Sequence, residues 1–326
     1  MKKFFVLVIM LIFTLFAFAD EWQDKYDTVN NYYTNGNYEM GYKKAQELLD
    51  YTLNKYDSKS VEAGHAYNIL GLISKKLDKF DESETYFNKS ITAFKASGDA
   101  EKKNVAIVKT NLGDLYFDYF YDDLATENLL DAVNWFEENN SYGDYNENLI
   151  MPYYDLYQIY EYAYDYPNAI KYMKKMIEVE EKTYGKNDTL VGVDYRTLAW
   201  LYINSDDYEG AQPYFEKSLS VLKVNGGYNN NQLGVTYNDY GVLYDYTGEY
   251  NKALEYYKKA TEVFEKSKNN IELANTYNNM GLAYEKLGKK SDAKKYYQKA
   301  YDLSKKENGE NNEDTKKYKE NLDRVK

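Results

Sequence analysis

The residue types that most often carry catalysis are scarce in this sequence. The chain contains no cysteine and a single histidine, His65. Nucleophilic or acid–base catalysis needs a nucleophile with a nearby base, or paired acids, in one site. Carboxylates do occur in pairs, as at Asp122 and Asp123, but neighbours on a helix point in different directions. We interpret these pairs as solvated surfaces and His65 as a packing or surface residue, and we expect no enzyme activity and no cofactor.

One segment imitates the start of a calcium-binding loop. Asp144, Asn146 and Asn148 have the spacing of the first ligands of such a loop. However, Leu149 stands where the loop requires glycine, and Asp155 stands where it requires a bidentate glutamate. We interpret the segment as an ordinary polar loop and expect no metal site.

An internal repeat organises the chain between Trp22 and Glu307. In several copies a small residue is followed three residues later by an aromatic one, as Gly281 is followed by Tyr284. The copies begin near residues 22, 64, 106, 150, 192, 234 and 274. Each unit is too short to bury its own apolar side, so it must stack on its neighbours. The pattern predicts one continuous helical array.

The last two copies closely resemble the tetratricopeptide repeat, with the spacing W-x2-LG-x2-Y followed by A-x3-F-x2-A. Their long unit and the residues 278–281, Asn-Asn-Met-Gly, are similar to the kinesin-light-chain type. The resemblance implies an all-α, right-handed solenoid of about seven helix-turn-helix repeats over residues 20–307. Tyr318, Leu322 and Val325 form an apolar stripe, which predicts a closing helix within residues 308–326 that covers the last repeat.

Residues 1–19 have the features of a secretory signal. Lys2 and Lys3 precede an apolar run that ends at Ala17-Phe18-Ala19, a pattern typical of cleavage before Asp20. An uncleaved membrane anchor is the alternative, but the run is shorter than the roughly 20 residues of a membrane span. We therefore expect an exported protein, periplasmic or extracellular, that keeps no membrane anchor after cleavage.

Composition limits the partners. Without residues 1–19 the chain has 39 basic and 53 acidic residues, a net charge of −14, so it repels nucleic acid. Many of its 41 tyrosines fall at the packing positions of the repeat. The alternative is that part of them form an adhesive or sugar-stacking surface.

The family resemblance implies that the first helices of successive repeats line a concave groove. Applied to each unit, that spacing gives thirteen candidate binding residues: Asn68, Asp114, Phe117, Asp118, Tyr154, Gln158, Glu161, Tyr162, Arg196, Trp200, Asn238, Asp245 and Asn278.

Two features of this set suggest a mechanism. Asn68, Asn238 and Asn278 share one repeat position, and a row of side-chain amides can pair with the backbone of an extended peptide. Asp114, Asp118 and Glu161 are projected beside the aromatic residues, which suits lysine or arginine side chains of a partner.

The sequence thus predicts an exported scaffold that binds a protein or a basic, extended peptide. Glycan binding, with Trp200 and tyrosines stacking on sugar rings, is a second hypothesis. A third is a structural component that self-associates through its convex tyrosines. Peptide-sensing cytoplasmic regulators share the solenoid but carry no export signal.

Overall fold

A computed structural model describes residues 21–139, 147–225 and 231–325. These residues form helices and no strand, which confirms the predicted all-α fold. The predicted signal, residues 1–19, and the first two positions of the calcium-like segment, Asp144 and Asn146, lie outside the described residues.

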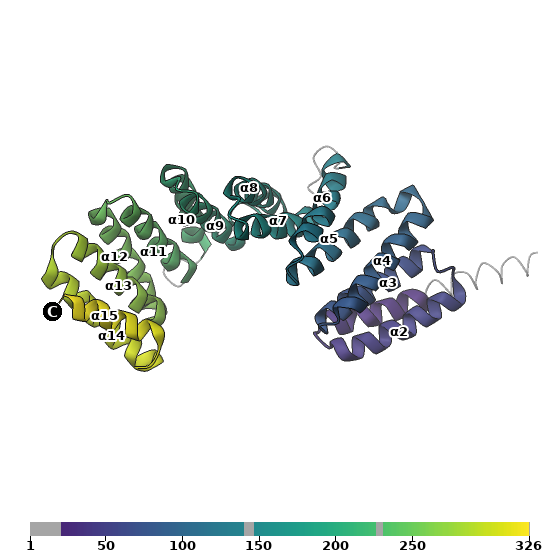
Figure 1. Ribbon diagram of the computed structural model, residues 1–326, viewed down its shortest axis with the longest axis horizontal. Coiled ribbons are helices and arrows are strands. Elements are labelled where there is room, and N and C mark those ends of the chain that lie inside the picture. Colours follow the sequence, from purple (N-terminus) through teal and green to yellow (C-terminus); the bar gives the residue numbers. More distant parts are fainter. Residues whose placement is uncertain (1–20, 140–146, 226–230, 326) are drawn as a thin grey trace, which may run out of the picture. The chain divides into compact units, whose positions relative to one another are not determined.

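The helices follow one another in pairs joined by short turns (Figure 1). A helix over residues 21–34 is followed by α2 (Tyr38–Lys55). The later pairs are α3 (Val61–Lys76) and α4 (Phe80–Ser97), α5 (Lys102–Asp118) and α6 (Asp122–Glu138), α7 (Ile150–Tyr162) and α8 (Tyr166–Thr183), α9 (Thr189–Asn204) and α10 (Tyr208–Asn225), α11 (Asn231–Tyr246) and α12 (Tyr250–Ser267), and α13 (Asn270–Lys286) and α14 (Lys290–Asn308), before a single α15 (Glu313–Arg324). Two 3-10 turns, Asp99–Glu101 and Glu147–Leu149, precede α5 and α7.

The chain divides into two compact units, one ending at Ile159 and the other beginning at Tyr160. In the first unit α3 packs on α4 and α5 on α6, and the first helices α3 and α5 also touch. In the second unit α9 to α14 pack in the same order, and α11 touches both α9 and α13. Each unit is therefore a stack of helical hairpins, as a solenoid requires.

Glycines on the first helices explain how closely the hairpins pack. A Cβ atom added at Gly71 would lie 2.6 Å from the ring of Phe87, and one added at Gly241 would lie 2.5 Å from the ring of Tyr257. Both rings are fully buried. The aromatic ring of the second helix thus rests on the backbone of the first, and a side chain at the glycine position would displace it.

The turn inside each hairpin uses one backbone conformation. Its central residue has a positive φ in every repeat, at Gly36, Asp78, Phe120, Tyr164, Asp206, Gly248 and Gly288. Glycine and aspartate tolerate this conformation, whereas a large side chain is strained in it. Phe120 and Tyr164 are therefore exceptions, and both are exposed.

The last helix covers the end of the second unit. Tyr318 of α15 packs with Ala274 and Ala300, and Leu322 packs with Ala293 and Tyr297. Asn312 caps the helix by accepting hydrogen bonds from the backbone N–H groups of the first turn. The stripe seen in the sequence is thus the buried side of a closing helix.

Candidate partner-binding face

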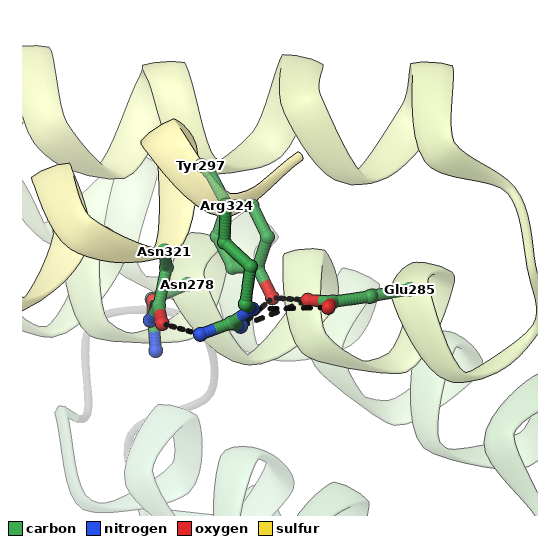
Figure 2. A network of polar contacts seen from close by, with 5 residues as sticks. All are labelled: Asn278, Glu285, Tyr297, Asn321 and Arg324. Atoms are coloured by element: carbon green, nitrogen blue, oxygen red, sulfur yellow. Dashed lines mark hydrogen bonds and ion pairs between the residues drawn. The ribbon is translucent and has the colours of Figure 1, made fainter. Parts of the chain in front are cut away.

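A network of polar contacts joins α15 to the last repeat (Figure 2). Arg324 donates from Nε to Glu285 Oε1 at 3.0 Å and from Nη2 to Glu285 Oε2 at 2.9 Å. The hydroxyl of Tyr297 donates to the same carboxylate at 2.6 Å, and Arg324 Nη1 donates to Asn321 at 2.9 Å. The hydrogen bonds from Arg324 lower the pKa of Glu285, so this carboxylate is held in its charged form.

The sequence brings Tyr297 and Glu285 together through Gly281. The tyrosine lies on the glycine backbone, and its hydroxyl reaches the carboxylate one turn further along α13. The preceding repeat has the same arrangement, with Asp245 one turn after Gly241 and the hydroxyl of Tyr257 donating to Asp245 Oδ2. We call each of these a tyrosine–carboxylate pair.

The pair in the preceding repeat lacks an arginine. Asp245 Oδ1 is buried and has no hydrogen-bond partner among the described residues. Burial raises the pKa of Asp245 to about 6, although the hydrogen bond from Tyr257 acts in the opposite direction. A buried acceptor without a donor costs about 1 to 3 kcal/mol, so a cation that reached Asp245 would be stabilised there.

The residue that follows Asp245 on α11, Tyr246, has an exposed aromatic ring. Tyr246 is 57% exposed, and its ring stacks on that of Tyr208, with centroids 5.7 Å apart and planes 12° apart. A guanidinium group favours a carboxylate together with an aromatic face. Asp245, Tyr246 and Tyr208 are therefore the groups of the second unit that we consider as candidates for binding an arginine side chain.

The predicted row of asparagines exists, but its amides bond to one another. Asn238 and Asn278 are 5% and 1% exposed. In each case the side-chain oxygen accepts a hydrogen bond from an asparagine of the following first helix or of α15: Asn68 from Asn111 at 3.0 Å, Asn238 from Asn279 at 3.1 Å, and Asn278 from Asn321 at 2.8 Å. The row therefore links repeats within each unit.

The acidic residues of the first unit are engaged by a lysine. Lys75, which is 8% exposed, forms ion pairs with Asp114 and, at 2.8 Å, with Asp118. Asp155 of α7 is buried close by, and burial, followed by the negative charge of Asp114, raises its pKa to about 8. A basic partner would have to compete with Lys75 for Asp114 and Asp118, which sequence spacing did not indicate.

In the second unit, Arg196 and Trp200 meet at Asp239. The indole of Trp200 donates to Asp239 Oδ2 at 2.8 Å, and Nε of Arg196 lies 3.9 Å from the same oxygen. Asn238 donates to Oδ1 of Asp239 at 3.4 Å. Sequence reasoning missed Asp239, although it stands one residue after Asn238, as Asn279 stands one residue after Asn278.

The remaining predicted residues are distributed over both units. In the first unit Phe117 and Gln158 are half-buried and Tyr154 is 43% exposed. In the second unit Tyr162 is 65% exposed, and burial raises the pKa of Glu161. We call the predicted positions on the first helices of each unit the first-helix face of that unit, and Asp245 lies on that of the second unit.

Other kinds of site find little support in the described residues. They contain no group of three His, Asp or Glu side chains placed to hold a metal ion. His65 packs edge-to-face on Phe94, with ring centroids 4.9 Å apart, and burial lowers its pKa. Within the same residues, no helix combines the length and apolar character of a membrane span.

Comparison with known proteins agrees with the repeat pattern and the fold. Tetratricopeptide repeat models match residues 64–96, 201–266 and 232–306. The C-terminal part of a TPR repeat-containing protein from Cytophaga hutchinsonii is 20% identical, with a TM-score of 0.61 over 91% of this chain and 99% of that chain. No curated protein sequence matches this chain significantly.

Two further solved structures share the fold. BtubC (BKLC) from P. vanneervenii is 17% identical, with a TM-score of 0.55 over 71% of this chain and 92% of that chain. The nearly identical TPR-like repeats of a putative kinesin light chain from Podosopora anserina are 12% identical, with a TM-score of 0.53 over 63% of this chain and 96% of that chain. This α-solenoid of helical hairpins is a tetratricopeptide repeat protein.

Proposed function

We propose that this protein is an exported, non-catalytic scaffold that binds a segment of a partner protein on the first-helix face of its second unit. An arginine side chain of that segment makes the main contact. The tetratricopeptide repeat fold supports the general role of a protein-binding scaffold. The acidic composition favours a basic partner and disfavours nucleic acid. The arginine requirement comes from the tyrosine–carboxylate pairs.

The observation that carries this proposal is the difference between two equivalent pairs. Glu285 is satisfied by Tyr297 and by Arg324 of the same chain. Asp245 is bonded to Tyr257 but keeps one oxygen without a donor among the described residues. The contact made by Arg324 is thus an intramolecular example of the contact that Asp245 would offer to a partner. Tyr246 adds an exposed ring to that site.

Selection from a library of random peptides tests this function. Peptides captured by the wild-type protein should be enriched in arginine, and those captured by Asp245→Asn should lose this enrichment. Asp123→Asn is a matched control, because Asp123 lies in the first turn of α6 in the first unit and is not one of the residues of the Asp245 site. Equal arginine content in the three selections would contradict the proposal.

Export is a separate part of the proposal and rests on the sequence of residues 1–19. Expression of the full chain in a bacterium with an outer membrane, followed by mass spectrometry of the exported fraction, tests it. We expect a mature chain that begins at Asp20. Intact protein retained in the cytosol would contradict export and leave the binding site unaffected.

A further inference from the structure

The third repeat contains a cavity of about 330 Å³ between α4, α5 and α6. Its apolar wall is formed by Trp135 of α6 together with Val105 and Ala106 of α5. Charged side chains surround this wall: Lys95, Asp99, Lys102, Lys109 and Asp131. The cavity lies on different residues from the first-helix face and is independent of the proposed function.

Comparison with the other repeats shows that this place is altered in the third one. The position of Lys109 holds tyrosine in the other repeats from the second onward, at residues 67, 153, 195, 237 and 277, and the position of Asp131 holds lysine, at residues 89, 175, 217, 259 and 299. The lysine lies over the tyrosine ring in three of these repeats: Lys89 over Tyr67 at 5.7 Å, Lys217 over Tyr195 at 4.9 Å and Lys299 over Tyr277 at 4.8 Å.

The third repeat replaces this cation–π pair with an ion pair. Lys109 bonds to Asp131 across α5 and α6. Hollows at the equivalent place in the second and fifth repeats are lined by the tyrosine–lysine pairs themselves. Because Lys109 has no ring, the wall beside it is formed by Val105 and Ala106 instead.

A second exchange places an aromatic ring in the same cavity. The position of Trp135 holds alanine, valine or leucine in the other repeats, at Ala93, Val179, Val221, Val263 and Leu303. Trp135 packs edge-to-face with Phe136, with centroids 5.3 Å apart, and is half-buried. The third repeat thus differs from the others in the residue type at three positions, Lys109, Asp131 and Trp135, and all three line one cavity.

The lining combines groups that recognise different parts of one ligand. A tryptophan face packs against the C–H groups of a sugar ring or another flat surface. Asp131 and Asp99 can accept hydrogen bonds from hydroxyl groups. Lys95 forms no ion pair or hydrogen bond with a described residue, so its ammonium group is available to an acid group. Lys102 lies 3.2 Å from Asp99.

We propose that this cavity binds an acidic sugar residue, that is, a hydroxyl-bearing ring with a carboxylate or phosphate group. The ring lies on Trp135, its hydroxyls donate to Asp131 and Asp99, and its acid group pairs with Lys95. Asp131 and Asp99 are already paired with Lys109 and Lys102, and their remaining acceptor lone pairs favour a hydroxyl-bearing anion over a purely apolar one. The volume is at the lower end of the range of small-molecule sites, about 300 to 1,000 Å³, and accommodates one sugar ring.

Titration calorimetry of the full chain with three probes tests the site: glucuronic acid, glucose 6-phosphate and glucose. We expect at least one of the two acids to bind at least ten-fold more tightly than glucose. Comparison of the affinities for the two acids shows whether the site prefers a carboxylate or a phosphate group. If neither acid binds, or if glucose binds as tightly as both, the proposal is wrong.

The double variant K109Y/D131K tests the location of the site without disturbing the fold. It introduces the tyrosine and lysine that stand at the same positions of the other repeats. It should unfold at or above the wild-type temperature and should bind the acidic sugar at least ten-fold more weakly. Lys95→Gln should weaken the binding of the acidic sugar and leave the binding of glucose unchanged. Unaltered binding by K109Y/D131K would place the sugar elsewhere and overturn the assignment.

Discussion

Arg324 holds the carboxylate of Glu285 through two hydrogen bonds, of 3.0 and 2.9 Å. The same carboxylate accepts from Tyr297, so one acidic group joins α13, α14 and α15. With the buried contacts of Tyr318 and Leu322, this ionic contact fastens the closing helix to the last repeat. The contact between Arg324 and Glu285 also shows that a tyrosine–carboxylate pair accepts hydrogen bonds from a guanidinium group.

Removing this guanidinium should loosen the closing helix. Arg324 is half exposed, so we expect Arg324→Ala to cost only about 1 kcal/mol, much of it local to α15. Hydrogen exchange of the α15 amides measures the effect, and faster exchange is expected there. Lys306→Ala, which removes a 75% exposed partner of Glu307, is the control and should leave α15 unchanged. Equal exchange in both variants would show that apolar packing alone holds the helix.

The turn at Phe120 should be improvable. Phe120 has a φ of 62° and is 85% exposed, so its ring contributes little packing while its backbone is strained. Phe120→Asn should raise the free energy of unfolding by about 0.5 to 1 kcal/mol, because asparagine tolerates this conformation. Phe120→Ala removes the same ring but keeps the strain, so it should give no gain. A gain of equal size in both variants would assign the effect to the exposed ring. Chemical denaturation distinguishes these outcomes.

Stability should fall as the pH rises from about 5 to 8. The pKa of Asp155 is raised to about 8 by burial, so the folded protein binds a proton that the unfolded chain has released. The stabilisation is complete below the unfolded pKa near 4 and is lost as the pH rises through 8. Asp245, whose pKa is raised to about 6 by burial, also makes the folded state less stable as the pH rises.

Asp155→Asn tests this cause. The variant should flatten the decline of the unfolding free energy between pH 5 and 8 by on the order of 2 to 4 kcal/mol. Thermal unfolding at several pH values measures the slope. An unchanged slope in Asp155→Asn would assign the decline to other groups, such as Glu180, whose pKa burial also raises.

The repeat itself was predictable, because packing imposes small and aromatic residues at fixed spacing. Gly241 and Tyr257, or Gly281 and Tyr297, can be found from sequence since their contact recurs sixteen residues apart. The stripe of α15 was predictable for the same reason. These features depend on contacts within one hairpin or between neighbours.

The side-chain partners on the first-helix face were less accessible to sequence reasoning. Lys75, Asp239 and Asn279 each bond to a residue of a neighbouring repeat about forty positions away. Such pairs depend on how far one repeat is rotated on the next and on which rotamer reaches across. Spacing alone placed Asp114 and Trp200 on the face without revealing that other side chains already contact them.

The most direct test of the account is a double-mutant cycle on the Asp245 site. An arginine-containing peptide from the selection is titrated into wild type and Asp245→Asn, with its arginine either intact or replaced by neutral citrulline. We predict a coupling energy of about 1 to 2 kcal/mol between Asp245 and the arginine. Strictly additive losses would show that this carboxylate does not contact the arginine and would contradict the proposed mode of binding.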